Sequence, residues 1–115
     1  MSNRGHDRER AVKAILEVWR WVVVRSAGSL GPVDLMAVGC GHVNHPLLGA
    51  RSYALPQVML VEVKSTGKGP FERFGPTERR EASKLAARCG GKPLLAWWPP
   101  GGGLQWIEQS TWPLS

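Results

Sequence analysis

The segment from Val58 to Lys64 constrains the fold more than any other part of this sequence, because four apolar residues lead into a Glu-x-Lys pattern. Side chains alternate between the two faces of a strand, so Glu62 and Lys64 share one face while Val61 and Val63 lie on the other. A carboxylate and an ammonium at the end of an apolar strand are costly to remove from water unless their charges are compensated. The segment therefore predicts a central strand with a polar site at its C-terminal end.

A second acid, Asp34, stands at the head of another apolar run and follows Pro32-Val33. Two acids and a lysine on neighbouring strands would make a compact oxygen-ligand site for a hard divalent cation, with the lysine close to a phosphate or an attacking water. An Asp followed later by Glu-x-Lys is similar to the pattern of the PD-(D/E)xK nucleases. Glu-x-Lys is also common on solvated sheet faces as an ordinary ion pair, so the motif alone discriminates poorly.

The length of 115 residues predicts a single domain, residues 1–115, because the chain is too short to build two cores. Fifteen Lys and Arg against nine Asp and Glu leave a net charge of +6, which favours a polyanionic partner. Nucleic acid is preferred to membrane, because no apolar run approaches the roughly 20 residues that span a bilayer. The first residues are not typical of a signal peptide, so we expect a cytoplasmic protein.

Two cysteines, Cys40 and Cys89, do not make a disulfide framework, and an intracellular protein would keep them reduced. Cys40 lies close to His42 and His45, which raises the question of a zinc site. Such a site needs four ligands at regular spacing, and the fourth could come only from a distant residue. We therefore interpret these residues as parts of a surface loop.

Hydrophobic periodicity and turn residues predict an α/β fold, in which a mixed five-stranded sheet is flanked by helices. The first two strands should form an antiparallel hairpin, and the 39–56 segment should be an extended loop because it carries several glycines and prolines. The predicted elements are a helix over 5–20, strands over 21–25, 33–38 and 57–64, a helix over 76–89, and strands over 92–98 and 104–108.

Glu9 continues the apolar stripe of the first predicted helix, which is formed by Val12, Ile15, Leu16 and Trp19. A glutamate in the first turn can act as an acid that favours the helix dipole. It can equally be a carboxylate directed off the end of the core toward a neighbouring site. Three carboxylates that met there would repel one another without a cation, so a site shared by Glu9, Asp34 and Glu62 implies a metal.

The chain resembles the archaeal-type Holliday junction resolvases, which are homodimeric nucleases of the restriction-endonuclease-like fold. The resemblance covers most of the chain in ordered blocks. These are Arg4-Gly5-x-x-x-Glu9-Arg10, Val24-Arg25-Ser26-Ala27-Gly28-Ser29, Val33-Asp34-Leu35-Met36-Ala37, Val61-Glu62-Val63-Lys64-Ser65-Thr66 and, more loosely, Gly91-Lys92-Pro93-Leu94-Leu95-Ala96.

The resemblance implies that Glu9, Asp34 and Glu62 bind Mg²⁺, for which Mn²⁺ is expected to substitute. It also implies that Lys64 stabilises the transition state and that a loop serine is active, Ser29 being preferred and Ser26 the alternative. Arg10 and Arg25 would contact the DNA backbone. Further basic residues expected to contact phosphates lie in the loop after the Glu-x-Lys strand and along the second helix: Lys68, Arg73, Arg80, Lys84 and Arg88.

Two features depart from the family. The 39–56 segment is longer than the usual short connection, and the second helix begins Thr77-Glu78-Arg79-Arg80 where a glutamine is expected. The sequence does not assign a role to either departure.

The function expected from this combination is Mg²⁺-dependent cleavage of four-way DNA junctions by a homodimer. A nuclease of the same fold that acts on flaps, nicks or duplex ends is an alternative, as is a non-catalytic DNA-binding module. The tryptophans are interpreted as core and interface residues rather than as base-stacking platforms. The Trp97/Trp98 region, together with Trp106, is the predicted dimer surface.

Overall fold

The computed structural model describes residues 4–26 and 33–114. Its elements follow the order that the sequence predicts: one helix, three strands, a second helix and two strands. They are α1 (Arg4–Val18), β1 (Val22–Arg25), β2 (Leu35–His45), β3 (Gly49–Lys64), α2 (Pro76–Arg88), β4 (Lys92–Trp97) and β5 (Gln105–Glu108), followed by the short 3-10 helix η1 (Gln109–Thr111).

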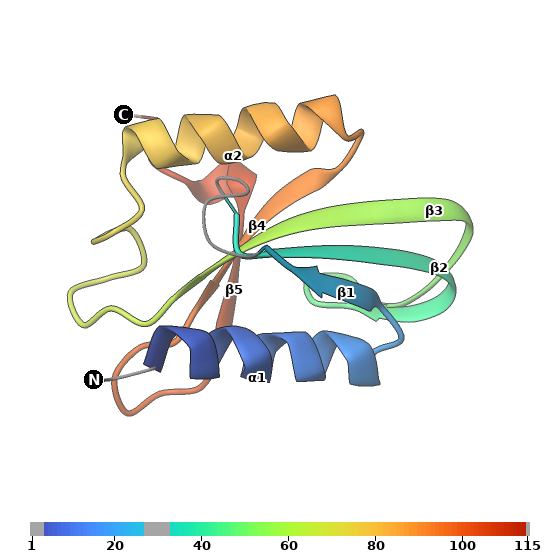
Figure 1. The fold of residues 1–115 in the computed structure, drawn as a ribbon, viewed down its shortest axis with the longest axis horizontal. Helices are drawn as coiled ribbons and strands as arrows, with labels where there is room; N and C mark the ends of the chain where they lie inside the picture. Colours follow the sequence, from blue (N-terminus) through green and yellow to red (C-terminus); the bar gives the residue numbers. More distant parts are fainter. Residues whose placement is uncertain (1–3, 27–32, 115) are drawn as a thin grey trace.

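The five strands form one mixed sheet in the order β1-β2-β3-β4-β5 (Figure 1). The β1–β2, β2–β3 and β4–β5 pairs are antiparallel, and β3 pairs with β4 in parallel. A parallel pair needs a crossover connection, which α2 provides between β3 and β4. The predicted mixed five-stranded sheet, its β1–β2 hairpin and its central β3 are therefore confirmed.

The prediction of an extended loop over 39–56 is wrong, because most of this segment forms a long β2–β3 hairpin. The pairing continues past Gly39 to His45, which lies opposite Gly49. Gly41 has a φ of +71° beside a shift in register, and Pro56 lies in the stretch that this shift leaves unpaired. Glycine and proline are tolerated at such a bulge because the ladder is interrupted there, so these residues mark an irregularity and not the end of the strand.

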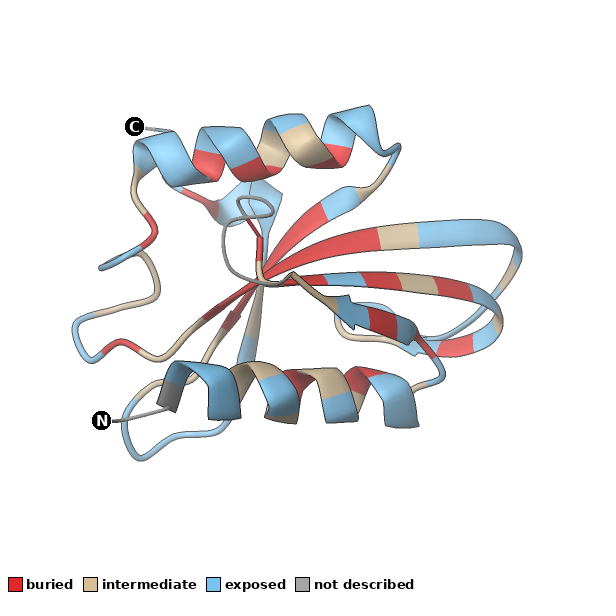
Figure 2. Ribbon diagram, viewed as in Figure 1, coloured by how far each residue is buried: buried red, intermediate tan, exposed pale blue. Residues whose placement is uncertain are grey.

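The two helices cover opposite sides of the sheet, with a hydrophobic core under each (Figure 2). Val12 and Leu16 of α1 are fully buried in the core that includes Val61. Ala82 and Ala86 of α2 are buried in the core that includes Leu60. The strand β3 is thus buried on both faces from residue 59 to 63, as expected for a strand covered by helices on both sides.

Most tryptophans pack within the chain, in agreement with their interpretation as core residues. Trp21 and Trp112 are buried, one in each core. Trp19 and Trp106 lie with their ring centroids 6.0 Å apart at the edge of the α1-side core. Trp98 is also partly buried against that core.

No helix within residues 4–26 and 33–114 is both long and apolar enough to cross a bilayer.

Candidate active site

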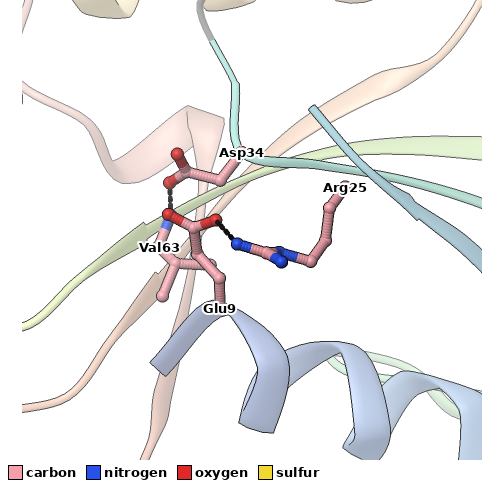
Figure 3. A network of polar contacts seen from close by, with 4 residues as sticks. All are labelled: Glu9, Arg25, Asp34 and Val63. Carbon is pink, nitrogen blue, oxygen red and sulfur yellow. Dashed lines mark hydrogen bonds and ion pairs between the residues drawn. The ribbon is translucent and has the colours of Figure 1, made fainter. Parts of the chain in front are cut away.

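Asp34 is held against β3 by both its backbone and its side chain. Its amide donates to the Val61 carbonyl at 3.0 Å, and its Oδ2 accepts a hydrogen bond of 2.8 Å from the Val63 amide (Figure 3). The residue immediately precedes β2, whose first residue Leu35 pairs with Val61. The antiparallel register therefore brings Asp34 to the end of β3 that carries Glu62.

Glu62 is buried, with 6% of its surface exposed, in the middle of an otherwise apolar stretch. Burial raises the pKa of its carboxyl well above the usual range, and a hydrogen bond with the Asp34 side chain and the charge of Asp34 raise it further. Lys64 acts in the opposite direction but does not offset these effects. Glu62 and Asp34 thus form a hydrogen-bonded carboxyl pair, and the positive charge of Lys64 compensates it only in part.

Glu9 approaches the same place from the first half of α1 (Figure 3). Burial and the charge of Asp34 raise its pKa, and the neighbouring Arg25 guanidinium offsets this only in part. Nη2 of Arg25 lies 3.3 Å from Oε1 of Glu9. The α1 glutamate is therefore directed toward the sheet, as one of the two sequence-based alternatives predicted, and Arg25 is turned toward it.

Lys64 lies at the exit of β3, where its carbonyl accepts a hydrogen bond of 2.8 Å from the Trp98 amide. Its Nζ is 3.8 Å from Oε2 of Glu78, in the first turn of α2. Sequence reasoning did not identify Glu78 as a neighbour of the site. The only signal was the departure from the expected glutamine, and contact with Lys64 depends on how α2 packs.

Only one of the two candidate serines lies within the described residues. Ser29, the preferred residue, lies outside the described residues. Ser26 follows β1, and its amide donates to the Asp34 carbonyl at 2.8 Å. Its Oγ is buried and has no hydrogen-bond partner among the described residues, and the same holds for Nε of Arg25. Both atoms are buried polar groups whose hydrogen-bonding capacity is not met within the described residues.

Glu62, Asp34 and Glu9 are the residues that would hold a metal at this site. No three His, Cys, Asp or Glu side chains are already gathered as a ligand set in the part of the chain that the structure describes. The donor chemistry nevertheless fits a hard cation, because the raised pKa values of Glu62 and Glu9 reflect carboxyl groups in need of positive charge. Arg25 contacts only Oε1 of Glu9, at 3.3 Å.

Aromatic residues support the site from β4 and the segment after it. Nε1 of Trp97 donates a hydrogen bond of 3.0 Å to the carbonyl of Thr66, two residues beyond Lys64. The Arg8 guanidinium carbon lies 4.4 Å from the ring centroid of Trp98. These contacts connect the start of α1 and the segment after β3 to the C-terminal end of β4. The sequence did not predict them.

The remaining predicted DNA-binding residues have exposed side chains: Arg10, Lys68, Arg73, Arg80, Lys84 and Arg88. By contrast, Arg79 is buried, donates to the Phe74 carbonyl at 2.6 Å and lies over the Phe71 ring. Arg79 therefore serves the packing of α2. Its exposed neighbour Arg80 is the one that remains available at the surface.

The cysteine and histidine residues considered for zinc take part in the hairpin. The Cys40 thiol faces the carbonyl oxygens of Tyr53 and Ala54 at 3.7 and 3.9 Å. Nδ1 of His45 accepts hydrogen bonds from the amides of Leu47 and Leu48, which close the turn. Both side chains are thus occupied with backbone groups of the β2–β3 hairpin.

Comparison with known proteins gives a match in structure but not in sequence. No family model matches the sequence, and no curated protein matches it either. Among solved structures, the chain is similar to Hjc, a Holliday junction resolvase from the hyperthermophilic archaeon Archaeoglobus fulgidus, with a TM-score of 0.68. The match has 19% sequence identity and covers 92% of this chain and 73% of the resolvase chain. The chain thus has the restriction-endonuclease-like fold.

Proposed function

We propose that this protein is a metal-dependent endonuclease that cleaves branched DNA, with the four-way junction as its substrate. The observation that carries the proposal is the meeting of Asp34, Glu62 and Lys64 at one strand end, with Glu9 beside them, on the fold of a Holliday junction resolvase. Fold alone does not determine activity, so the proposal depends on this particular set of side chains.

Each residue of the set has a role in hydrolysis of a phosphodiester. Asp34, Glu62 and Glu9 would hold Mg²⁺, or Mn²⁺ in its place, and the bound ion would supply Lewis acidity and lower the pKa of a water molecule. The Val63 amide keeps the Asp34 carboxylate in position. Lys64 presents a positive charge at the same strand end, where it can stabilise charge that develops on the phosphate.

Glu78 competes with that role, because its carboxylate lies 3.8 Å from the Lys64 ammonium and is largely exposed. An exposed ion pair contributes little free energy, so a DNA phosphate can replace Glu78 as the partner of Lys64. When no substrate is bound, the Lys64 ammonium thus lies toward Glu78 at the start of α2.

A homodimer is part of the proposal, because two copies of the site could cut two strands of one junction. The Trp97/Trp98 region remains the predicted contact surface, although Trp97 and Trp98 are already half-buried within their own chain. Large exposed apolar side chains also occur on β1, at Val22 and Val24. Sedimentation of the purified protein would give its oligomeric state directly.

The experiment that tests the function is cleavage of a labelled four-way junction beside flap, nicked and plain duplex controls of the same sequence. We expect the junction to be cut in Mg²⁺ or Mn²⁺ and to stay intact when both are chelated. Faster cleavage of the flap or nicked substrate would favour a nuclease of the same fold with another substrate. Binding without cleavage of any substrate, in either metal, would favour a non-catalytic DNA-binding module.

A further inference from the structure

A groove with basic lining residues lies at the C-terminal end of α1, where this helix meets the β2–β3 hairpin. A groove of about 360 Å³ is formed there by the end of the helix and both strands of the hairpin. Its ionisable lining residues are Arg20, Arg51 and His42, and no carboxylate lines it. We refer to this feature, between residues 18–20 and residues 42–44 and 50–52, as the hairpin groove.

Hydrogen bonds fix the two walls of the hairpin groove to each other. The Asn44 amide donates to the carbonyl of Trp19 at 3.0 Å, and Nε1 of Trp21 donates to the carbonyl of Asn44 at 2.8 Å. Gly39 allows the Trp21 ring to lie directly against the hairpin, because a Cβ at that position would be 2.7 Å from the ring. The groove is therefore preformed, and a ligand would not have to order it.

Arg20 has a left-handed backbone conformation, which is unusual for a residue with a long side chain. It follows the helix with a φ of +76°, and it is the only non-glycine residue with a positive φ within residues 4–26 and 33–114. Glycine or asparagine is favoured at such a helix end, because a Cβ is strained there. An arginine at this position disfavours folding relative to glycine, so its guanidinium is a candidate for a role other than stability.

The side chains of Arg20 and Arg51 make no hydrogen bond or ion pair within the part of the chain that the structure describes. Both residues are exposed. Two guanidinium groups on a preformed groove, with no acid among its lining residues, suit an anionic ligand with several phosphates better than an apolar partner.

We infer that the hairpin groove binds the phosphate backbone of a DNA arm at a distance from the cleaved bond. The inference rests on the proposed function and assigns a role to the hairpin that lengthens the β2–β3 connection. Glu9 and Val18 are nine residues apart in α1, which corresponds to about 14 Å along the helix axis. Along the axis of a DNA duplex, one strand has a phosphate about every 3.4 Å, so an arm that runs parallel to α1 would meet the groove about four or more nucleotides from the site.

The first test compares the salt dependence of junction binding, measured without divalent cation so that the DNA stays intact. Each phosphate contact contributes about 0.9 to the slope of log affinity against log salt concentration. We expect Arg51→Gln to lower this slope by about one and Arg20→Gln/Arg51→Gln by about two. Lys92→Gln, which removes an exposed charge outside the groove, serves as the matched control and should leave the slope unchanged.

The second test places single uncharged methylphosphonates along one junction arm. Wild-type protein should lose affinity when the neutralised phosphates lie about four or more nucleotides from the cleavage site, as estimated from the helix rise. At those positions, the substitution should not lower the junction affinity of the double variant any further. Near the cleavage site, it should lower the affinity of the double variant as much as that of wild type. Equal responses of both proteins at every position, or an unchanged salt slope, would overturn the inference.

Arg20→Gly separates binding from folding. Glycine relieves the backbone conformation, so the melting temperature should stay the same or rise while the salt slope falls. A lower melting temperature with an unchanged slope would mean that Arg20 acts in stability, and the inference would be wrong. If the double variant binds as wild type does while junctions are still cut, the inference fails alone; if wild type neither binds nor cuts any DNA, the proposed function fails with it.

Discussion

The Val63 amide donates a hydrogen bond of 2.8 Å to Oδ2 of Asp34, and this contact connects the acid before β2 to the strand that carries Glu62. Val63 itself is an apolar residue whose side chain is buried in the core under α1. The carboxyl pair is thus positioned by core packing, since any shift of β3 in the core would move the amide that holds Asp34. This relationship underlies the predictions on metal, stability and catalysis.

Metal binding should be measurable without DNA. Added Mg²⁺ or Mn²⁺ should raise the melting temperature of the wild-type protein, because a ligand that binds only the folded state stabilises it by mass action. Asp34→Asn should reduce or remove the shift, whereas Asp7→Asn, an exposed acid of α1 outside the site, should keep it. The same metal-induced shift in Asp34→Asn as in wild type would mean that the cation binds elsewhere.

The pH dependence of stability should reflect the buried carboxyl of Glu62. Burial and Asp34 raise the pKa of Glu62 in the folded state. The contribution of Glu62 to the free energy of unfolding is therefore complete below its ordinary pKa of 4.5, and it is lost as the pH rises toward the folded-state pKa. Without metal, Glu62→Gln should therefore be more stable than wild type at neutral pH, by roughly 4–8 °C in melting temperature per kcal/mol gained. The two proteins should converge below about pH 4.5. A variant less stable than wild type at neutral pH would contradict this reasoning.

Lys64 and Glu78 should have separable effects on cleavage. Lys64→Ala should lower the single-turnover rate by orders of magnitude with little change in junction affinity, as expected for a group that acts mainly in the transition state. Glu78→Gln should keep the rate within a few-fold of wild type and bind the junction more tightly, because a negative charge that competes with phosphate is gone. Glu81→Gln, an exposed acid of the same helix, is the control for the charge change.

The active serine should be identified by comparing two alanine variants. Ser29→Ala is expected to slow cleavage more than Ser26→Ala does if the preferred assignment is right. The opposite order would move the assignment to Ser26, whose Oγ is buried without a hydrogen-bond partner among the described residues. Equal, negligible effects in single-turnover assays would exclude both serines from the mechanism.

Junction recognition should depend on phosphate contacts for affinity and on the dimer for selectivity. Loss of a single phosphate-contacting residue, such as Arg80 or Lys84, should weaken binding to all junction sequences alike and lower the salt slope by about one. Disrupting the dimer through Trp97 and Trp98 should remove the preference for junctions over duplex before it removes DNA affinity. A monomeric variant with an undiminished preference for junctions would contradict this account.

The fold could be predicted from the sequence wherever periodicity and burial act together. The 57–64 strand was recognisable because its apolar run ends in Glu62 and Lys64, and the structure places it at the centre of the sheet. The 39–56 hairpin could not be predicted, because glycine and proline indicate a loop unless one knows that they lie at a bulge. The need for glycine at position 39 arises from Trp21, whose ring packs against it and which precedes β1 in the sequence. Such a contact between distant residues cannot be read from the local sequence.

The site could be predicted only in part, for a similar reason. Asp34, Glu62 and Glu9 were predicted to share a site from their positions in the predicted elements, and in the structure Asp34 lies close enough to the other two to raise the pKa of each. The contact between Lys64 and Glu78 depends on the packing of α2, and the contact between Arg25 and Glu9 depends on how α1 lies beside β1. Neither contact has a signal in local sequence. The DNA contact expected of Arg25 stays a prediction, and the structure adds its contact with Glu9.

The central claim is that the carboxyl cluster is the catalytic centre of a junction-cleaving nuclease. Single-turnover cleavage of a four-way junction in Mg²⁺, by wild type and by Glu62→Gln at protein concentrations that saturate the DNA, tests it most directly. We predict cleavage by wild type and none by the variant, with junction binding equal or tighter because glutamine keeps the shape of the side chain and cannot carry a negative charge toward the phosphates. Cleavage by Glu62→Gln at the wild-type rate would contradict the account.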